Sequence, residues 1–258
     1  MTDNLIEVTK LRKEFGGLVA VGGVDFVVPE RSIVSLIGPN GAGKTTFFNM
    51  LTGVYKPTVG RVIFADEDLT GKPPHAFTQR GIGRTFQNIR LFQNMTALEN
   101  VLVGMHSRMK GRILGSIFLT PKVRREEREA REKARDLLRT AGLGNVDDEL
   151  AESLSYGDQR RLEVARALAT EPKLLLLDEP TAGMNPQETA VFIDFVSELR
   201  EKRPIAILLI EHDMRVVMGV SERVTVLDYG EKISEGTPQE VQRDERVIEA
   251  YLGTAAVS

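Results

Sequence analysis

Cysteine is missing from this 258-residue chain, as are an excess of basic residues and any long hydrophobic run. Without cysteine the chain can form no disulfide and no cysteine-ligated metal site. Its formal net charge of −3 lacks the positive balance that nucleic-acid-binding proteins use to contact phosphates, so no nucleic-acid partner is predicted. No apolar run approaches the roughly 20 residues of a membrane-spanning helix, and the first residues lack a secretory signal pattern. We therefore expect that any work at a membrane needs a separate spanning subunit.

One nine-residue motif organises the rest of the sequence. It matches the phosphate-binding loop pattern G-x-x-x-x-G-K-[ST] at every fixed position, and its residues are Gly38, Pro39, Asn40, Gly41, Ala42, Gly43, Lys44, Thr45 and Thr46. Residues 32–37 predict a short buried strand, and residues 47–52 predict a helix that stops at Gly53. Glycines let the backbone approach a ligand closely, so that several N–H groups can bind anionic oxygens beside the helix N-terminus. Lys44 is expected to reach the β- and γ-phosphates of a nucleotide, and the Thr45 hydroxyl to bind Mg²⁺.

Short β-like runs alternate with helical stretches along the chain, without an internal repeat. The predicted strands cover residues 5–11, 24–28, 32–37, 61–64, 81–85, 173–178, 205–210, 224–227 and 232–234. The predicted helices cover residues 47–52, 122–139, 158–170, 187–200 and 213–220, one that begins near Thr96, and a C-terminal region from Thr237. This order predicts an α/β fold, with an antiparallel layer around a parallel core and a helical insertion.

Two parts of the insertion admit more than one interpretation. Residues 122–139 are dense in charge, with opposite charges at i,i+4 spacing such as Arg125 and Glu129, and we interpret them as a solvated helix face rather than a binding face. The apolar run 113–119 packs under the helical part or contacts a membrane subunit; the sequence leaves both interpretations open.

Two adjacent carboxylates, Asp178 and Glu179, follow four consecutive leucines. Ending a buried strand in two acids is costly unless the acids have a function. Because successive strand side chains point in opposite directions, Asp178 can hold Mg²⁺ while Glu179 orients or deprotonates a water. The alternative is that the acids only cap the following turn.

Two further sites have a structural and a functional interpretation. Ser155 and Asp158 have the spacing of a capping box, which predicts a helix N-terminus there, and Gly157 would leave that N-terminus accessible to an anion. His212 follows the apolar run 205–210. A lone histidine is commonly structural, but its position at the end of a strand parallel to the Asp178 strand favours a role at the same site.

Taken in order, these motifs resemble the ATP-binding subunits of ABC transporters over essentially the whole chain. The phosphate loop is followed by Phe86-Gln87, then by Leu-Ser-Tyr-Gly-Asp at 154–158, Leu-Asp-Glu-Pro at 177–180 and Glu-His-Asp at 211–213. Finer details resemble the branched-chain amino-acid importer subgroup; they lie at residues 84–88, 118–121, 154–159, 182–186 and 248–253. The resemblance implies a P-loop NTPase (RecA-like) core of mixed sheet, with an antiparallel β subdomain and an inserted α-helical subdomain.

The resemblance also implies roles for single residues. Phe15 matches the aromatic that stacks on adenine, and Gln87 matches the glutamine that contacts Mg²⁺ and reports to the membrane subunit. Glu179 matches the catalytic base, and His212 matches the residue that holds the γ-phosphate. The implied catalytic set is Glu179, His212, Lys44 and Gln87, and the implied Mg²⁺ ligands are Thr45, Gln87 and Asp178.

A second copy of the ATPase completes the implied site. The signature residues Ser155, Tyr156, Gly157 and Asp158 would face ATP held by the other protomer. Tyr156 and Asp158 depart from the commonest signature, Leu-Ser-Gly-Gly-Gln. Asn185 stands where an aspartate is common, which puts a charged role across the interface in doubt.

The resemblance implies an ATP-hydrolysing subunit at the cytoplasmic face of the inner membrane, powering uptake of branched-chain amino acids. Its partners would be a second ATPase subunit, identical or paralogous, the transmembrane permease subunits and, indirectly, a substrate-binding protein. The alternative cargoes are other amino acids, amides or urea. Residues 1–258 would form one domain, with an ATP-binding core at 1–87 and 160–236, a helical subdomain at 88–159 and a C-terminal helical tail at 237–258.

Three other classes are disfavoured by the sequence. ABC ATPases that act on translation carry two units in one chain, and those that act on DNA repair insert a very long coiled coil, whereas the interval here is about a hundred residues. Small-molecule kinases and GTPases lack the signature stretch, and no Asn-Lys-x-Asp motif is present. A non-enzymatic binding module is disfavoured because Glu179 and His212 are both intact.

Overall fold

A computed structural model of the chain describes residues 4–105 and 121–255. The apolar run 113–119 lies outside these residues. The described residues contain two β-sheets. The larger has the strand order β10-β9-β3-β8-β7-β6, and its strands are β3 (Ile33–Ile37), β6 (Ile82–Arg84), β7 (Leu174–Asp178), β8 (Ala206–Ile210), β9 (Arg223–Asp228) and β10 (Glu231–Gly236).

The centre of the larger sheet is parallel and completely buried. Strands β6, β7, β8, β3 and β9 pair in parallel, and β10 returns antiparallel to β9 as the predicted hairpin. Every residue of β3, β7 and β8 is buried, as expected for continuous apolar strands covered on both faces. The carboxyl ends of β3, β7 and β8 therefore meet at one edge, where the phosphate loop, Glu179 and His212 follow them.

The smaller sheet is antiparallel, with the order β2-β1-β4-β5. Its strands are β1 (Asn4–Phe15), β2 (Leu18–Pro29), β4 (Val59–Phe64) and β5 (Glu67–Asp68). Strands β1 and β2 are longer than the predicted runs 5–11 and 24–28. Lys10 has a positive φ of 46°, and the pairing register shifts between Val8 and Leu11. This irregularity interrupts the alternation of apolar and polar residues, so the sequence pattern ended before the strand did.

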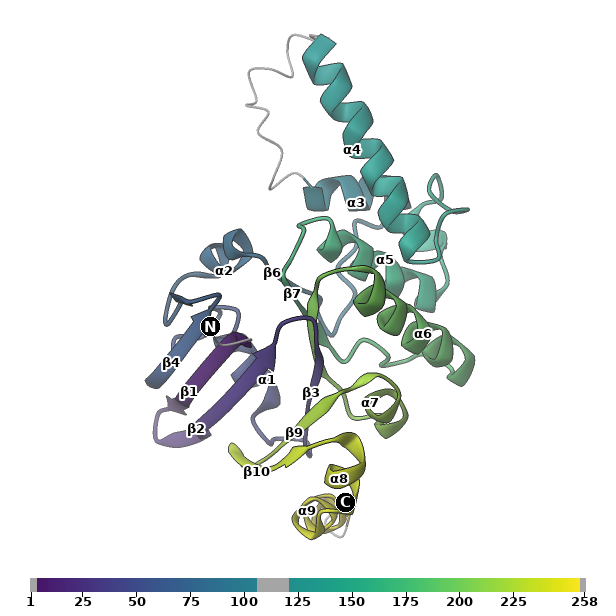
Figure 1. Cartoon of the computed structure of the whole chain (residues 1–258). Coiled ribbons are helices and arrows are strands. Elements are labelled where there is room, and N and C mark those ends of the chain that lie inside the picture. Colours follow the sequence, from purple (N-terminus) through teal and green to yellow (C-terminus); the bar gives the residue numbers. More distant parts are fainter. Residues whose placement is uncertain (1–3, 106–120, 256–258) are drawn as a thin grey trace.

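Nine helices occur in the described ranges: α1 (Lys44–Met50), α2 (Pro74–Arg80), α3 (Ala97–Met105), α4 (Pro121–Thr140), α5 (Tyr156–Leu168), α6 (Pro186–Lys202), α7 (Met214–Val220), α8 (Pro238–Arg243) and α9 (Glu245–Ala255). Helix α2 was not predicted. Figure 1 shows α3, α4 and α5 gathered beyond the β6–β7 edge of the larger sheet. Among the described residues, none of these helices is both long and apolar enough to cross a membrane.

Local sequence signals account for several helix boundaries. The Thr96–Glu99 capping box forms as predicted, since each residue's side chain accepts from the other's backbone N–H, at 3.2 and 2.8 Å. A second box, between Asn185 and Glu188, opens α6. On α4, Arg125 Nε lies 2.8 Å from Glu129 Oε1, and both side chains are exposed, which fits a solvated face.

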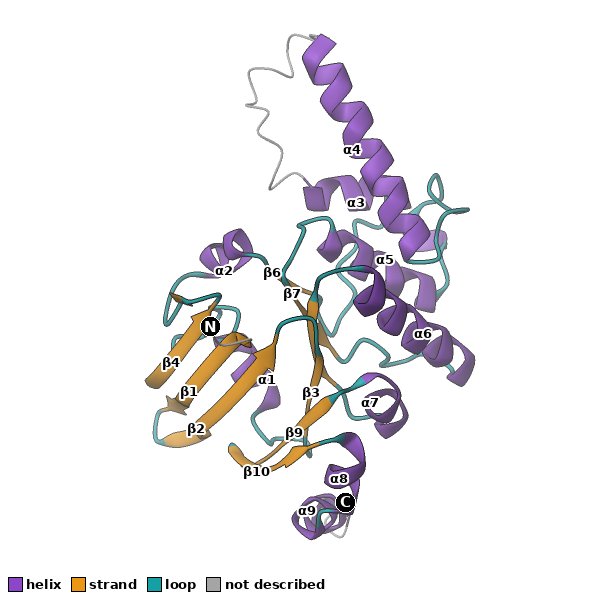
Figure 2. Ribbon diagram, viewed as in Figure 1, coloured by secondary structure: helices purple, strands orange, loops and turns teal. Residues whose placement is uncertain are grey.

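Apolar packing between the two sheets fixes the position of the phosphate loop. Phe47 and Phe48 of α1 are fully buried in a cluster that includes Leu36 of β3 and Phe26 of β2. The rings of Phe26 and Phe47 meet edge to face, with centroids 5.3 Å apart. Burying an aromatic side chain of this size stabilises the fold by about 2–3 kcal/mol. The helix that follows the phosphate loop is therefore held between the antiparallel layer and the parallel core (Figure 2).

Candidate functional site

The phosphate loop connects the end of β3 to the start of α1, as the sequence predicted. Gly38 and Gly43 have positive φ values of 148° and 95°. An added Cβ would lie 2.0 Å from the Leu227 carbonyl oxygen at Gly38, and 2.3 Å from the Ala20 carbonyl oxygen at Gly43. Only glycine fits these two positions, because neighbouring backbone occupies the space that a side chain would need.

Lys44 is the first residue of α1, and its side chain is folded back over the loop. Its Nζ donates to the carbonyl oxygens of Gly38 and Pro39, at 2.6 and 2.8 Å. Burial lowers the pKa of Lys44, and the nearby Glu179 carboxylate partly offsets that effect. The ammonium is thus held at the mouth of the loop, where anionic oxygens would meet it.

A cavity of about 440 Å³ lies over the loop. It is lined by Leu18, Val19, Ala20, Asn40, Gly41, Ala42, Gly43, Lys44, Thr45, Thr46, Gln87, Glu179 and Tyr229. The structure therefore brings Gln87 and Glu179, far apart in the sequence, to the predicted phosphate site. Leu18 to Ala20 and Tyr229 were missed, because no local pattern indicates that the β1–β2 and β9–β10 turns reach the loop.

Glu179 is held between two other predicted residues. Its Oε2 accepts a hydrogen bond from Gln87 Nε2 at 3.0 Å, and lies 3.9 Å from His212 Nδ1. Glu179 also has a positive φ of 46°, which is uncommon for a residue with a side chain and often marks a functional position. Gln87, Glu179 and His212 thus form a row at the carboxyl edge of the sheet.

The two adjacent acids face different groups, with Asp178 as the last residue of β7 and Glu179 just beyond the strand. Asp178 Oδ2 lies 3.0 Å from Arg84 Nη2, and both side chains are largely buried. Arg84 also donates to Asn49 Oδ1 at 2.8 Å and to Thr52 Oγ1 at 3.0 Å. Arg84 was missed as a site residue; its only signal was its place in the run 84–88.

Glu211 is a second residue that the sequence analysis did not single out. It is fully buried. Its Oε1 accepts from the backbone N–H and the hydroxyl of Thr181, at 3.1 and 2.5 Å, and its Oε2 accepts from the N–H groups of His212 and Asp213, at 3.0 and 3.3 Å. Glu211 thereby ties the loop after Glu179 to the end of β8, which carries His212.

Phe15 lies at the end of β1, outside the cavity lining. Its ring is 41% exposed and meets Tyr55 edge to face, with centroids 5.3 Å apart. Lys13 Nζ lies 4.9 Å from the same ring centroid. The exposed ring is available for stacking, at the same end of the β1–β2 hairpin as Leu18.

The signature turn differs from its predicted form in two respects. Ser155 Oγ accepts from the Asp158 N–H at 3.2 Å, but the Asp158 side chain pairs with Arg161, so only half of the predicted capping box forms. The Gly157 N–H, predicted to be open to an anion, donates to Glu188 Oε1 at 3.3 Å in the described chain. In the first case Arg161 binds the Asp158 carboxylate, and in the second Glu188 accepts from the Gly157 amide. None of Ser155, Tyr156, Gly157 and Asp158 lines the cavity over the phosphate loop.

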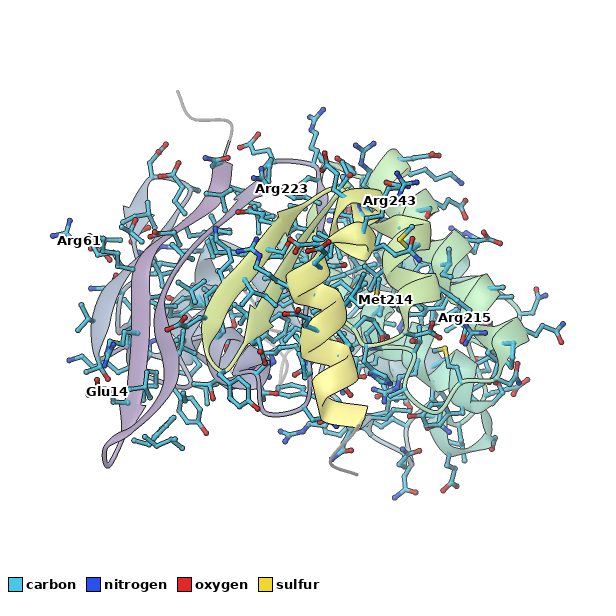
Figure 3. The ribbon with its side chains drawn as sticks, turned by 90° about the horizontal axis from the view of Figure 1, so that it is seen from below. Glu14, Arg61, Met214, Arg215, Arg223 and Arg243 are labelled. Carbon is cyan, nitrogen blue, oxygen red and sulfur yellow. The ribbon has the colours of Figure 1, made fainter. Side chains whose placement is uncertain are left out.

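The C-terminal helix α9 packs behind the phosphate loop. Tyr251 contacts the cluster that contains Val226, Val247 and Ile37, the last residue of β3. Burial raises the pKa of the Tyr251 phenol, and the nearby backbone of Gly38 partly offsets that rise. Figure 3, seen from below, shows α9 in yellow across this end of the molecule, with Met214 of the same cluster labelled beside it.

Comparisons with known proteins agree with this architecture. The family model for ABC transporters matches residues 21–182. A solved ATP-binding cassette of an ABC transporter, in its ADP conformation, is 35% identical with a TM-score of 0.85, covering 98% of this chain and all of that one. A dimeric cassette bound to ADP and phosphate is 26% identical with a TM-score of 0.75, covering 90% of this chain and 98% of its own. The chain belongs to the ABC transporter family, whose ATPase domain binds ATP and couples its hydrolysis to transport.

Within that family, the similarity points to one group. The family model for branched-chain amino acid ATP-binding cassette transporters matches residues 231–257. Two curated relatives are named high-affinity branched-chain amino acid transport ATP-binding proteins. LivG of Salmonella typhimurium is 47% identical and BraF of Pseudomonas aeruginosa 46%, each over 255 residues, which is 99% of this chain and all of the relative.

Proposed function

We propose that this protein is the ATP-hydrolysing subunit of an importer for branched-chain, hydrophobic amino acids. The observation that carries the proposal is the similarity along the whole chain, C-terminal segment included, to proteins named for that transport. The cavity over the phosphate loop supports the ATPase part, because it joins the loop to Gln87 and Glu179.

Hydrolysis would use the row of residues at the sheet edge. Glu179 would orient and deprotonate the attacking water, and Gln87 would hold the Glu179 carboxylate through the 3.0 Å hydrogen bond. Lys44 and the loop N–H groups would stabilise the charge that develops on the transferred phosphoryl group. His212 would contact the γ-phosphate and Phe15 would stack on adenine. Each of these roles belongs to a side chain or amide of this chain.

Mg²⁺ fits the donors that are present. Mg²⁺ prefers oxygen ligands and commonly binds through one or two protein groups together with substrate phosphates. Thr45 and Gln87 line the same cavity and supply a hydroxyl and an amide oxygen. Asp178 is the carboxylate candidate, although Arg84 pairs with it here. We propose that Thr45, Gln87 and Asp178 hold Mg²⁺, which would neutralise phosphate charge when bound.

A second ATPase subunit, identical or paralogous, would complete the site. The signature residues Ser155, Tyr156, Gly157 and Asp158 lie outside this chain's own phosphate cavity, which fits a role on the partner's ATP. ATP would hold the two subunits together, and hydrolysis would release them. At the cytoplasmic face of the inner membrane, the ATPase would pass this motion to transmembrane permease subunits. A substrate-binding protein would be an indirect partner.

The proposed subdomains follow the layers of the fold. The ATP-binding core would be residues 1–87 and 160–236, the helical subdomain 88–159 and the C-terminal tail 237–258. Within the described part of 88–159 the helical elements are α3, α4, a short 3₁₀ turn and the start of α5.

Uptake of radiolabelled solutes tests the proposal. The protein would be co-expressed with its permease and binding protein, reconstituted in vesicles and supplied with ATP inside. We expect leucine, isoleucine and valine uptake to depend on ATP and to be lost with Glu179→Gln. Uptake of urea or of amides, without uptake of these amino acids, would overturn the proposed cargo and leave the ATPase role intact.

A further inference from the structure

Arg160 connects the signature turn to the loop that carries Gln87. Its side chain is 3% exposed and lies in the first turns of α5. The guanidinium donates to the carbonyl oxygen of Phe86 at 2.9 Å and to that of Gln87, and also to the Tyr156 hydroxyl at 2.8 Å. Glu163 Oε2 lies 3.4 Å from the same guanidinium and balances its charge. One buried cation therefore holds the backbone on both sides of Gln87.

Tyr156 occupies the space between Arg160 and the loop that follows Glu179. The Arg160 guanidinium carbon lies 5.3 Å from the Tyr156 ring centroid. On the other side, a Cβ added at Gly183 would meet ring atoms of Tyr156 at 3.3 Å, so the ring packs directly on that loop. A glycine at position 156, as in the commonest signature, would make neither contact.

The next residue of the turn contacts the same loop by a second route. The Gly157 N–H donates to Glu188 Oε1, and Glu188 Oε2 accepts from the Asn185 N–H at 2.9 Å. The signature turn is thus bonded to Asn185 through Glu188 and to the Gln87 loop through Arg160.

We propose that Arg160 and Tyr156 are positioning residues that make the signature turn, the Gln87 loop and the loop after Glu179 move together. The inference rests on the proposed dimer, in which the signature turn contacts the partner's ATP while Gln87 and Glu179 act on this chain's own ATP. A shift of the turn by the partner's ATP is then passed to the Gln87 backbone, and from the Gln87 amide to the Glu179 carboxylate.

Physical chemistry favours arginine for this task. Its planar fork donates in several directions at fixed angles, so the acceptors it bonds keep their relative positions. Hydrogen bonds from a charged donor are stronger than neutral ones, and burial removes competing water. Lysine, with one ammonium, cannot hold two carbonyl oxygens and a phenol in the same geometry.

Steady-state ATPase kinetics of the full-length protein in complex with its permease test the inference. Tyr156→Phe removes only the hydroxyl and keeps the ring against Gly183. We expect kcat to fall about five- to tenfold, from the loss of one charge-assisted hydrogen bond. Affinity for ATP, measured with a fluorescent ATP analogue, should stay within about twofold, because the phosphate loop is untouched. Arg160→Lys should lower kcat at least as much.

A double-mutant cycle separates positioning from a general structural effect. In a Gln87→Ala background the route to Glu179 is already cut, so Tyr156→Phe should cause no further loss of kcat in a radiometric phosphate-release assay. The matched control is Arg161→Lys, on the same helix, whose guanidinium holds the Ala141 carbonyl at 3.0 Å and Asp158 instead. It should keep kcat within about twofold.

Two outcomes would overturn the inference. One is an unchanged kcat for Tyr156→Phe, and the other is an equal fractional loss with and without Gln87. Neither outcome depends on the transported solute. Amino-acid uptake by the wild-type complex therefore tests the proposed function separately from this inference.

Discussion

The guanidinium of Arg84, at the end of β6, is paired with the carboxylate of Asp178, at the end of β7, with Nη2 and Oδ2 3.0 Å apart. The strands are parallel neighbours, so their ends place a cation next to the acid that is proposed to hold Mg²⁺. Arg84 therefore compensates a buried negative charge when no divalent cation does so. The same guanidinium reaches Asn49 of α1 and Thr52 just beyond it, so the pair also joins the phosphate-loop helix to the sheet edge.

Removing Arg84 should destabilise the nucleotide-free protein. Arg84→Ala leaves a largely buried carboxylate without its partner, and we expect the free energy of unfolding to fall by about 3 kcal/mol. Urea denaturation measures this loss in the free energy of unfolding. The matched control is Arg80→Ala, which breaks a shorter but exposed pair with Glu67, at 2.6 Å, and should cost much less because water screens exposed charges. Equal losses for the two variants would contradict the role given to Arg84.

Replacing Glu179 by glutamine should separate ATP binding from hydrolysis. The amide keeps the size of the side chain but cannot accept a proton, so turnover should fall by about 10²-fold or more. ATP affinity should change by less than about threefold, and the dimer should accumulate with ATP. Phosphate release and sedimentation measure these quantities. Glu222→Gln, an exposed pair partner of Arg200, is the control. Near-normal hydrolysis by Glu179→Gln would refute the assignment of the base.

Lys44→Ala should impair binding itself. The lysine ammonium lies over the loop at hydrogen-bond distance from Gly38 and Pro39, and its contacts with phosphate oxygens would be worth about 2–3 kcal/mol, or about 30- to 160-fold in affinity. Equilibrium binding of a fluorescent ATP analogue measures this loss, and the thermal midpoint verifies folding. Lys202→Ala, from an exposed pair on α6, should bind normally. Unchanged affinity for Lys44→Ala would contradict the interpretation of the loop.

The buried Glu163 should give the protein a pH-dependent stability. Burial raises the pKa of Glu163 above its ordinary value of 4.5, and the Arg160 guanidinium only partly opposes that rise. A raised folded-state pKa contributes stability that is fully present below the unfolded-state pKa and is lost as pH rises through the folded-state pKa. Wild type should therefore lose stability relative to Glu163→Gln as pH is raised from 4 towards 7, as measured by urea denaturation at each pH.

Glu240 supplies a control of opposite sign. The backbone N–H and hydroxyl of Thr237 lower the pKa of Glu240. Its contribution is present above the unfolded-state pKa and is lost as pH falls through the folded-state pKa. Wild type should thus gain stability relative to Glu240→Gln as pH rises through the acidic range. Parallel pH trends for the two variants would contradict the opposite shifts.

Much of the fold follows from local sequence signals. The buried strands around the phosphate loop, the β9–β10 hairpin and the Thr96–Glu99 box have patterns that act over a few residues, and the structure confirms them. The lengths of β1 and β2 could not be predicted, since their pairing continues through an irregularity that removes the alternation. Helix α2 was missed for a related reason, because it has a single buried residue, Phe77.

The candidate site divides in the same way. Gly38 to Thr46, Asp178, Glu179 and His212 stand beside recognisable strand ends, so the sequence could indicate them. Their pairings could not be predicted, because the partners come from distant positions: Arg84 pairs with Asp178, and Gln87 bonds to Glu179. The half-formed box at Ser155 shows the same limit, since Arg161 competes for the Asp158 carboxylate.

The packing of Tyr251 against the cluster that contains Ile37 joins residues more than two hundred positions apart. Ribosomes make a chain from its N-terminus, so the phosphate loop exists long before the helix that packs behind it. Until Tyr251 has been added and folded, the cluster at the end of β3 lacks the aromatic side chain that packs against it. A chain interrupted before α9 would therefore contain every motif for ATP and still lack the helix that packs behind the phosphate loop.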